Sequence, residues 1–172
     1  MDRKYLEIIW DFVSNISTFT WLIGVLIIIV PFFVYFWKYI KTQIRFGKNL
    51  RRKIYFLKTS ALKDLQNEKD LISNLKTFNI DSDIKDISGN VHKVDNLENK
   101  SVYIVGYDEN YGKYNELFEH ARINKIPLII YAKQGEIRKF EHWDLINNYI
   151  YGDIANTPNR IAVMTLNILK IL

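Results

Sequence analysis

An uncharged run of 26 residues, from Phe12 to Trp37, constrains this chain more than any other feature of its sequence. About 20 consecutive apolar residues are enough for a helix to cross the hydrocarbon core of a bilayer, so this run is long enough to span one membrane. A secretory signal peptide fits poorly, because the run is too long, basic residues follow it and no small-residue cleavage site is visible. We therefore predict a transmembrane helix within residues 1–40.

The first turns of this predicted helix carry polar residues. Glu7, Asp11 and Asn15 lie four residues apart, so a helix that begins near Asp2 places them on one face. Two interpretations remain open. Either the amphipathic start lies flat at the membrane surface with its acids in water, or the stripe faces the axis of an oligomer and forms a pore mouth whose carboxylates favour cations.

Positive charge is concentrated directly after the apolar run. Residues 38–52 carry six basic groups and no acidic one, whereas residues 53–172 carry 16 groups of each sign. Basic residues next to a membrane helix stay on the cytoplasmic side and attract anionic lipid. We therefore expect a basic juxtamembrane linker over 41–52 and a cytoplasmic domain over 53–172. The neutral domain argues against broad binding of duplex DNA, which requires a basic face.

Short apolar runs alternate with helical patterns throughout this domain. We predict strands at 53–58, 82–88, 101–106, 126–132 and 149–154, helices at 61–78, 110–125, 136–148 and 156–172, and a short helix or loop at 91–100. This order predicts an α/β domain, a five-stranded parallel sheet with helices on both faces, and a flavodoxin-like strand order of 2-1-3-4-5. For the last helix we expect a cap at Thr157, Pro158 in the first turn, and Ile161, Leu166 and Leu169 facing inward. In the helix at 61–78 we expect an apolar face made of Leu62, Leu65, Leu71, Ile72 and Leu75.

Ligands of such sheets bind beyond the carboxyl ends of the strands, at the point where the strand order reverses. Small residues, hydroxyls, tyrosine rings and cationic groups follow these strand ends, a combination that suits a phosphate and a stacked base. The candidate ligand-binding residues are Lys58, Thr59, Ser60, Gly106, Tyr107, Asn110, Tyr111, Lys133 and Arg160.

Several other kinds of site are disfavoured by what the sequence lacks. It contains neither a GxGxxG motif nor a P-loop, which argues against dinucleotide redox chemistry and NTP hydrolysis. It has no cysteine, and its three histidines lie on separate predicted elements. We therefore expect no metal site and no cofactor.

Two segments carry a resemblance to a known family. The segment SVYIVGYDENYGKYNELFEHARINKIPLIIYA (101–132) resembles the third strand, third helix and fourth strand of TIR-like and related Rossmann-type sensor domains. The segment IANTPNRIAVMTLNIL (154–169) is similar to their last helix. A single membrane segment joined to such a domain resembles small membrane effectors of bacterial antiphage defence, such as CRISPR-associated CARF membrane proteins and the effectors of CBASS, Pycsar and Hailong systems.

The resemblance implies a single-pass protein of the bacterial inner membrane that senses a nucleotide or short oligonucleotide. A partner enzyme encoded nearby would make this signal, and binding would gate a pore that depolarises the cell. One helix per chain cannot enclose a pore, so we expect a homo-oligomer, and a tetramer of cyclic symmetry is our specific prediction.

Two alternatives remain. In TIR enzymes a glutamate of the third helix contacts the ribose of NAD, and Glu116 is the matching position, although His120 stands where a small residue is expected. The first alternative is therefore a membrane-anchored NAD-cleaving or nucleoside-processing enzyme with Glu116 as its catalytic residue. The second is an anchored signalling adaptor, which would show neither conductance nor nucleotide binding. We favour the sensor over the enzyme.

Overall fold

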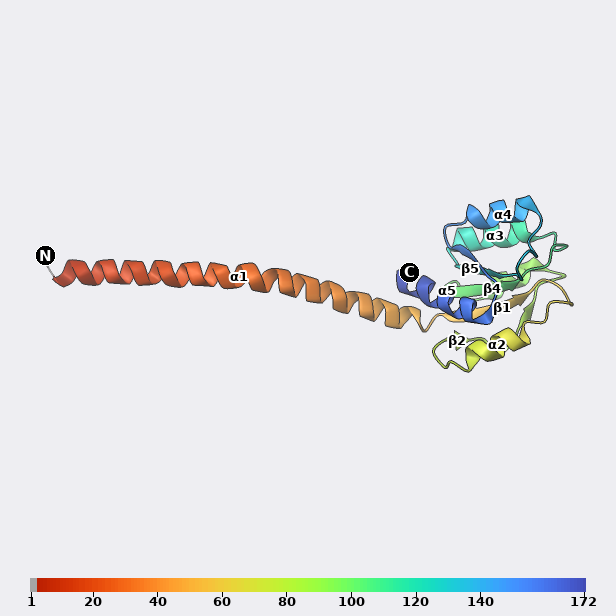
Figure 1. The fold of residues 1–172 in the computed structure, drawn as a ribbon, viewed down its shortest axis with the longest axis horizontal. Helices are drawn as coiled ribbons and strands as arrows, with labels where there is room; N and C mark the ends of the chain where they lie inside the picture. Colours follow the sequence, from red (N-terminus) through yellow and green to blue (C-terminus); the bar gives the residue numbers. More distant parts are fainter. Residues whose placement is uncertain (1–2) are drawn as a thin grey trace. The chain divides into compact units, whose positions relative to one another are not determined.

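A computed structural model describes residues 3–172, so the predicted helix start near Asp2 lies outside the described residues. The chain divides into two compact units, Met1–Ile44 and Arg45–Leu172. Helix α1 (Arg3–Asn49) supplies the first unit and also the first residues of the second (Figure 1).

Helix α1 is long and apolar enough to cross a membrane, by its length and composition. Its candidate span begins at Trp10, and none of the apolar window within it is buried against the rest of the chain. Pro31 lies inside the helix without ending it. The hydroxyls of Thr18 and Thr20 donate to the carbonyls of the preceding turn at 2.8 Å, so these polar groups are satisfied within the helix itself.

The helix continues to Asn49, through most of the segment that the sequence predicts to be a linker. The segment 38–49 contains no proline and is rich in lysine, arginine and other residues compatible with a helix. Phe46 and Leu50 also pack against the core of the second unit, so tertiary contacts stabilise the end of the helix.

The second unit contains one parallel sheet. Its strands are β1 (Lys53–Lys58), β2 (Asn79–Ile80), β3 (Lys85–Asp86), β4 (Ser101–Gly106), β5 (Leu128–Tyr131) and β6 (Gly152–Ala155). Their order is β2-β1-β4-β5-β6, with β3 also paired to β1, and every pairing is parallel. The predicted strand order is therefore confirmed.

The sheet has six strands and not five. The additional strand β2 lies outside the predicted bounds, and the predicted strand at 82–88 is present only as the short strand β3. The place beside β1 is shared by the two short strands β2 and β3. Between them, the Asp81 carboxylate accepts the N–H of Asp83 at 3.0 Å, a local turn that interrupts the extended backbone. The same carboxylate forms ion pairs with Lys53 at 3.1 Å and Lys85 at 3.5 Å, which fix this turn on the sheet.

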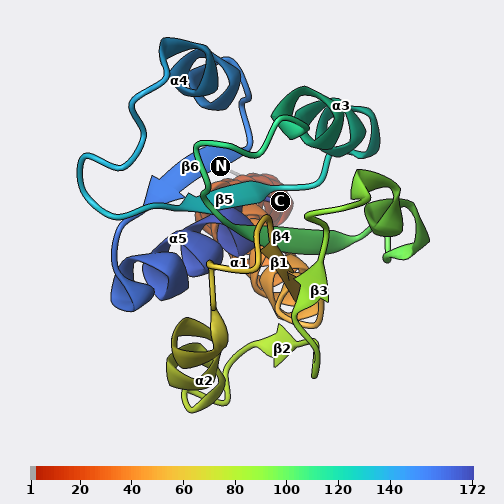
Figure 2. The ribbon, with the colours of Figure 1, turned by 90° about the vertical axis from the view of Figure 1, so that its right-hand side faces the viewer.

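Helices cover both faces of the sheet, as predicted (Figure 2). The helical elements are α2 (Gln66–Ser73), the 3-10 helix η1 (Val91–Asn96), α3 (Tyr114–Asn124), α4 (Phe140–Asn147) and α5 (Pro158–Ile171). Residues of α2 and α5 share one core cluster, and residues of η1, α3 and α4 share the other. The central strands β1 and β4 are buried on both sides, with Ile54 and Val102 in one cluster and Leu57 and Val105 in the other.

Helix α2 is much shorter than the predicted helix at 61–78. The Asp64 carboxylate accepts the N–H of Gln66 at 3.0 Å where the helix begins, and Lys76 has a positive φ of 52° after it ends. The predicted apolar face is only partly formed: Leu65 and Ile72 are buried, but Leu62, Leu71 and Leu75 are exposed.

The last helix begins as expected. The Thr157 hydroxyl accepts the N–H of Arg160 at 3.3 Å, and Pro158 is the first helical residue. Ile161 and Leu169 are buried, but the prediction for Leu166 is wrong, because it is 39% exposed. At about 100° per residue, Leu166 lies roughly 140° around the helix from Ile161 and cannot share its face.

Candidate functional site

The predicted ligand-binding residues divide between two cavities at the carboxyl edge of the sheet. Thr59, Ser60, Asn110 and Tyr111 line one of about 450 Å³ next to the ends of β1 and β4, which we call the switch-point cavity. Lys133 and Arg160 line another of about 440 Å³ next to the ends of β5 and β6, which we call the β5–β6 cavity. The sequence predicted a single site for these residues, but the structure divides them between two cavities.

The groups of the switch-point cavity are mostly engaged within the protein. The Thr59 hydroxyl donates to the Gly106 carbonyl at 2.6 Å, and the buried Tyr111 hydroxyl donates to the Ile87 carbonyl at 3.3 Å. The Lys113 ammonium donates to the Gly89 carbonyl at 2.9 Å. These contacts engage both hydroxyl protons and one of the three N–H donors of Lys113.

The switch-point cavity is lined by one charged group of each sign, Lys113 and Asp108. The Ser60 hydroxyl and the Asn110 N–H hold the pKa of Asp108 below its usual value, so this carboxylate is ionised at neutral pH. The Ser60 Oγ is itself buried, and it does not reach full hydrogen-bond geometry with any group of the described residues.

Lys58, Gly106 and Tyr107 line neither of these two cavities. A Cβ atom at Gly106 would meet Leu65 side-chain atoms at 3.2 Å, so this glycine is explained by close packing against the helix side of the sheet. Tyr107 is 1% exposed, and its hydroxyl lies 2.8 Å from Nδ1 of His142. Burial raises the pKa of Tyr107 to about 12, and its ring is part of the core and presents no face to a ligand. Lys58 is half-buried at the end of β1.

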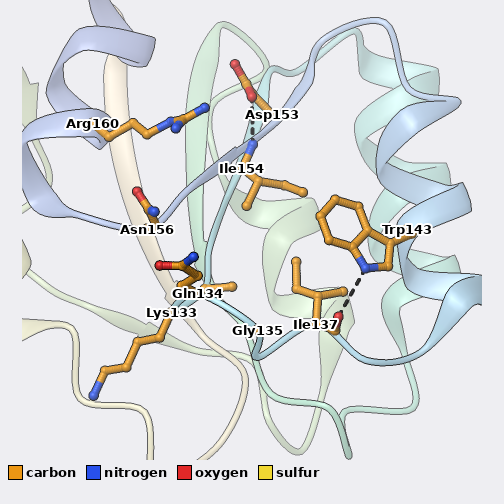
Figure 3. A pocket seen from close by; sticks show the side chains of 10 residues that line it. Lys133, Gln134, Gly135, Ile137, Trp143, Asp153, Ile154, Asn156 and Arg160 are labelled. Atoms are coloured by element: carbon orange, nitrogen blue, oxygen red, sulfur yellow. Dashed lines mark hydrogen bonds between the residues drawn. The ribbon is translucent and has the colours of Figure 1, made fainter.

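The β5–β6 cavity has one apolar side, built around Trp143 of α4 (Figure 3). The indole Nε1–H donates to the Ile137 carbonyl at 3.0 Å, which fixes the ring beside Ile137 and Ile154. Trp143 is 39% exposed, so part of its surface remains open to solvent. A fixed and partly open indole is a suitable platform for a planar ring.

The opposite side of the same cavity is polar. Arg160, Asn156 and Gln134 lie across from the indole, and the Arg160 side chain extends toward the side of the cavity that holds Asp153 (Figure 3). One oxygen of Asp153 accepts the N–H of Ile154 at 2.8 Å, which leaves its other oxygen available. Among the described residues, the Arg160 guanidinium forms no ion pair and no hydrogen bond. It is therefore free to bind an anion.

Lys133 contributes less than the sequence predicts. Its side chain lines the cavity near the backbone, but its ammonium group points away from the other labelled side chains (Figure 3). The backbone N–H of Lys133 donates to the Glu136 carboxylate at 2.7 Å, and Glu136 forms an ion pair with Lys63. With Gly135 at a φ of +75°, these contacts fix the loop that borders the cavity.

Sequence reasoning missed Trp143, Ile137 and Asp153 as site residues. One signal was available, since Trp143 is the only tryptophan of residues 45–172. The segment around it was read as helix by pattern alone, which gave no reason to direct the indole toward β5 and β6.

The proposed catalytic position and the polar stripe of α1 lie elsewhere. Glu116 is exposed in the first turn of α3 and lines none of the cavities described here, so the catalytic role stays an untested prediction. Glu7, Asp11 and Asn15 are exposed on α1, and their side chains form no hydrogen bond or ion pair with other described residues. Across the part of the chain that the structure describes, no group of three His, Asp or Glu side chains is placed to hold a metal ion.

No protein-family model, no curated protein and no solved structure matches this chain. The resemblance to nucleotide-sensing defence effectors remains a prediction from the sequence.

Proposed function

We propose that this chain is a membrane effector whose cytoplasmic domain binds a nucleotide or short oligonucleotide signal and thereby gates a pore formed by several copies of α1. The observation that carries the proposal is the β5–β6 cavity, where the free cation Arg160 faces the fixed indole of Trp143. This cavity belongs to the same unit as the last residues of the apolar helix α1.

The chemistry of the cavity suits a nucleotide. Its volume of about 440 Å³ lies within the range of roughly 300–1,000 Å³ that is usual for small-molecule sites. A base stacked on an aromatic side chain gains about 1–3 kcal/mol, a role that Trp143 would take. Arg160 would bind a phosphate through charge-assisted hydrogen bonds, and the free oxygen of Asp153 would accept from a ribose hydroxyl or a ring amine.

The switch-point cavity is a poorer candidate for the same ligand. Thr59 and Lys113 already donate to backbone carbonyls there, and the ring of Tyr111 is buried, whereas part of the Trp143 indole is open to solvent. We therefore propose that the phosphate binds at the β5–β6 cavity, two strand junctions away from the switch point between β1 and β4.

The membrane part of the proposal depends on α1 and on the charge that follows its apolar run. The apolar window of α1 is unburied, as expected of a helix that faces lipid. The six basic groups over 38–52 favour a cytoplasmic position for the second unit and contact with anionic lipid. Several chains are needed to enclose a pore, and we propose a cyclic tetramer in the bacterial inner membrane. In antiphage defence, an enzyme encoded nearby would supply the signal.

Binding of the four ribonucleoside 5′-monophosphates to the full-length protein in detergent tests the proposal. We expect isothermal titration calorimetry to detect binding of at least one of them, and the Trp143→Ala variant to lose it. Phe140→Ala is the matched control, since it removes an exposed aromatic side chain from the same helix that does not line the cavity.

Equal affinity of the wild type and Trp143→Ala would contradict the assignment of this cavity, as would the absence of binding by all four nucleotides. Mass spectrometry of small molecules released when the purified protein is denatured would then identify the natural ligand. A released nucleotide supports the proposal, and release of only non-nucleotide compounds contradicts it.

A further inference from the structure

Helix α5 connects the β5–β6 cavity with the end of α1. Arg160, in the first turn of α5, lines the cavity. At the other end of α5, the carbonyl of Leu169 accepts a hydrogen bond from the side chain of Asn49, the last residue of α1. At about 1.5 Å per residue, the nine residue steps from Arg160 to Leu169 correspond to roughly 13.5 Å along α5.

The contact between the two helix ends is buried and specific. Asn49 is 5% exposed, and its amide nitrogen donates to the Leu169 carbonyl at 2.9 Å. Its amide oxygen accepts from Nε of Arg52 at 3.1 Å, so both polar atoms of the side chain are engaged. The last carbonyls of a helix have no partner within the helix, and Asn49 satisfies one of them.

Apolar side chains near the ends of α1 and α5 also pack against the domain core. Phe46 and Leu50 at the end of α1, and Ile168 and Leu172 at the end of α5, pack against one core cluster. The end of α1 is therefore held by the domain and is not joined to it by a free linker. A displacement of α5 along the sheet would have to break these contacts or move the last turn of α1 with it.

The middle of α5 carries a local defect in its present packing. Thr165 is completely buried, and its hydroxyl forms no hydrogen bond with any other described residue. A buried hydroxyl without a partner is unfavourable, and native proteins contain few of them. A shift of α5 that gave this hydroxyl a partner would remove that cost, so the Thr165 hydroxyl would favour the shifted position over the present one.

We propose that α5 is the element that transmits ligand binding from the β5–β6 cavity to α1. The two helices are connected by the hydrogen bond from the Asn49 side chain to the Leu169 carbonyl, which we call the joint. This inference rests on the proposed function, because it requires a ligand that binds Arg160. A ligand can shift α5 only through different affinities for its two positions. Arg160 is on α5 and Trp143 is on α4, so a ligand that contacts both side chains senses the position of α5 relative to the rest of the cavity.

Hydrogen exchange of the full-length protein in detergent, read by mass spectrometry, tests this inference. The probe is the ribonucleoside 5′-monophosphate with the lowest Kd. We expect the bound nucleotide to change exchange at the start of α5, around 158–161, and also at the end of α1, around 46–50. In Asn49→Leu the response at 158–161 should remain, and the response at 46–50 should be lost.

Two further variants separate loss of the joint from loss of stability. Tyr149→Phe removes buried hydrogen bonds to the carbonyls of Ala121 and Ile126 on the other face of the sheet, so it weakens the fold without touching the joint. We expect it to keep both responses. Asn49→Asp keeps an acceptor for Arg52 but loses the donor to Leu169, and we expect it to behave as Asn49→Leu does.

The outcomes distinguish this inference from the proposed function. If none of the four nucleotides binds and the denatured protein releases no nucleotide, the proposed function fails. If a nucleotide binds and changes exchange at 158–161 but not at 46–50 in the wild type, the proposed function stands and the coupling role of α5 is wrong. An unchanged response at 46–50 in both Asn49 variants would also overturn it.

Discussion

Removal of the charge of Arg160 should weaken nucleotide binding while the domain remains folded. Arg160→Gln keeps a polar but shorter side chain, and the cap of α5 is unaffected, because Thr157 binds the backbone N–H of residue 160 and not its side chain. We therefore expect the melting temperature to stay close to that of the wild type. The predicted loss is confined to the interaction between the guanidinium and a phosphate.

The size of this loss follows from the exposure of the site. A hydrogen bond to a charged group contributes about 1.5–3 kcal/mol. Arg160 is exposed, so solvent screens the interaction, and we take the lower end of this range for its contribution to binding. A loss of about 1.5 kcal/mol corresponds to a roughly tenfold higher Kd. The Debye length is about 8 Å at physiological ionic strength, so added salt should weaken binding by the wild type more than binding by Arg160→Gln.

Titration calorimetry at two salt concentrations measures both effects, and Arg138→Gln is the matched control. Arg138 is an exposed arginine of the loop between β5 and α4, and it does not line the cavity. We expect Arg138→Gln to bind nearly as tightly as the wild type. Equal losses in the two variants would indicate only a general effect of net charge, and no loss in Arg160→Gln would refute the phosphate-binding role.

Three further predictions concern stability and the membrane segment. Burial by itself raises the pKa of Asp81, but hydrogen bonds and the charges of Lys53 and a second lysine outweigh it and lower the pKa overall. The ionised form therefore stabilises the fold at neutral pH, and this contribution is lost as the pH falls through the folded-state pKa. Asp81→Asn should lower the melting temperature at pH 7, and the difference from the wild type should shrink below about pH 4, as thermal scans by circular dichroism would show. Thr165→Val should raise the melting temperature, because it removes a buried hydroxyl without a partner and keeps the shape of the side chain; a lower value would show that the hydroxyl is satisfied. If the stripe on α1 lines a pore, Glu7→Lys and Asp11→Lys should shift ion selectivity toward anions in planar bilayers, and unchanged current and selectivity in both would exclude the stripe from the pore.

The sequence predicted the sheet well because its strongest signals are local. The runs at 53–58 and 101–106 are short and apolar, as expected of strands buried on both faces, and the alternation of strands and helices leaves few possible topologies. The edge at β2 and β3 was harder to predict. There, the turn around Asp81 depends on ion pairs with lysines of neighbouring segments, and a linear pattern does not contain this information.

The candidate site was predicted only in part, for a related reason. Sheet topology places residues at an edge but does not decide which side chains remain free. Thr59 and Tyr111 are at the predicted edge, yet their hydroxyls are bound to backbone carbonyls. Arg160 is free, and its partner across the cavity, Trp143, comes from a different helix through a loop whose path depends on Glu136. Such non-local contacts decide the site, and only the three-dimensional structure reveals them.

Ion flux through vesicles that contain the full-length protein is the most direct test of the central claim, that a nucleotide in the β5–β6 cavity controls a membrane pore. The probe is the ribonucleoside 5′-monophosphate that binds most tightly, added to the side that exposes the domain at a concentration near the wild-type Kd, where a variant with a roughly tenfold higher Kd is only about one-tenth occupied. We predict that it changes the ion permeability of vesicles with the wild-type protein and leaves that of vesicles with Arg160→Gln nearly unchanged. The same permeability with and without bound nucleotide in the wild type would contradict the account.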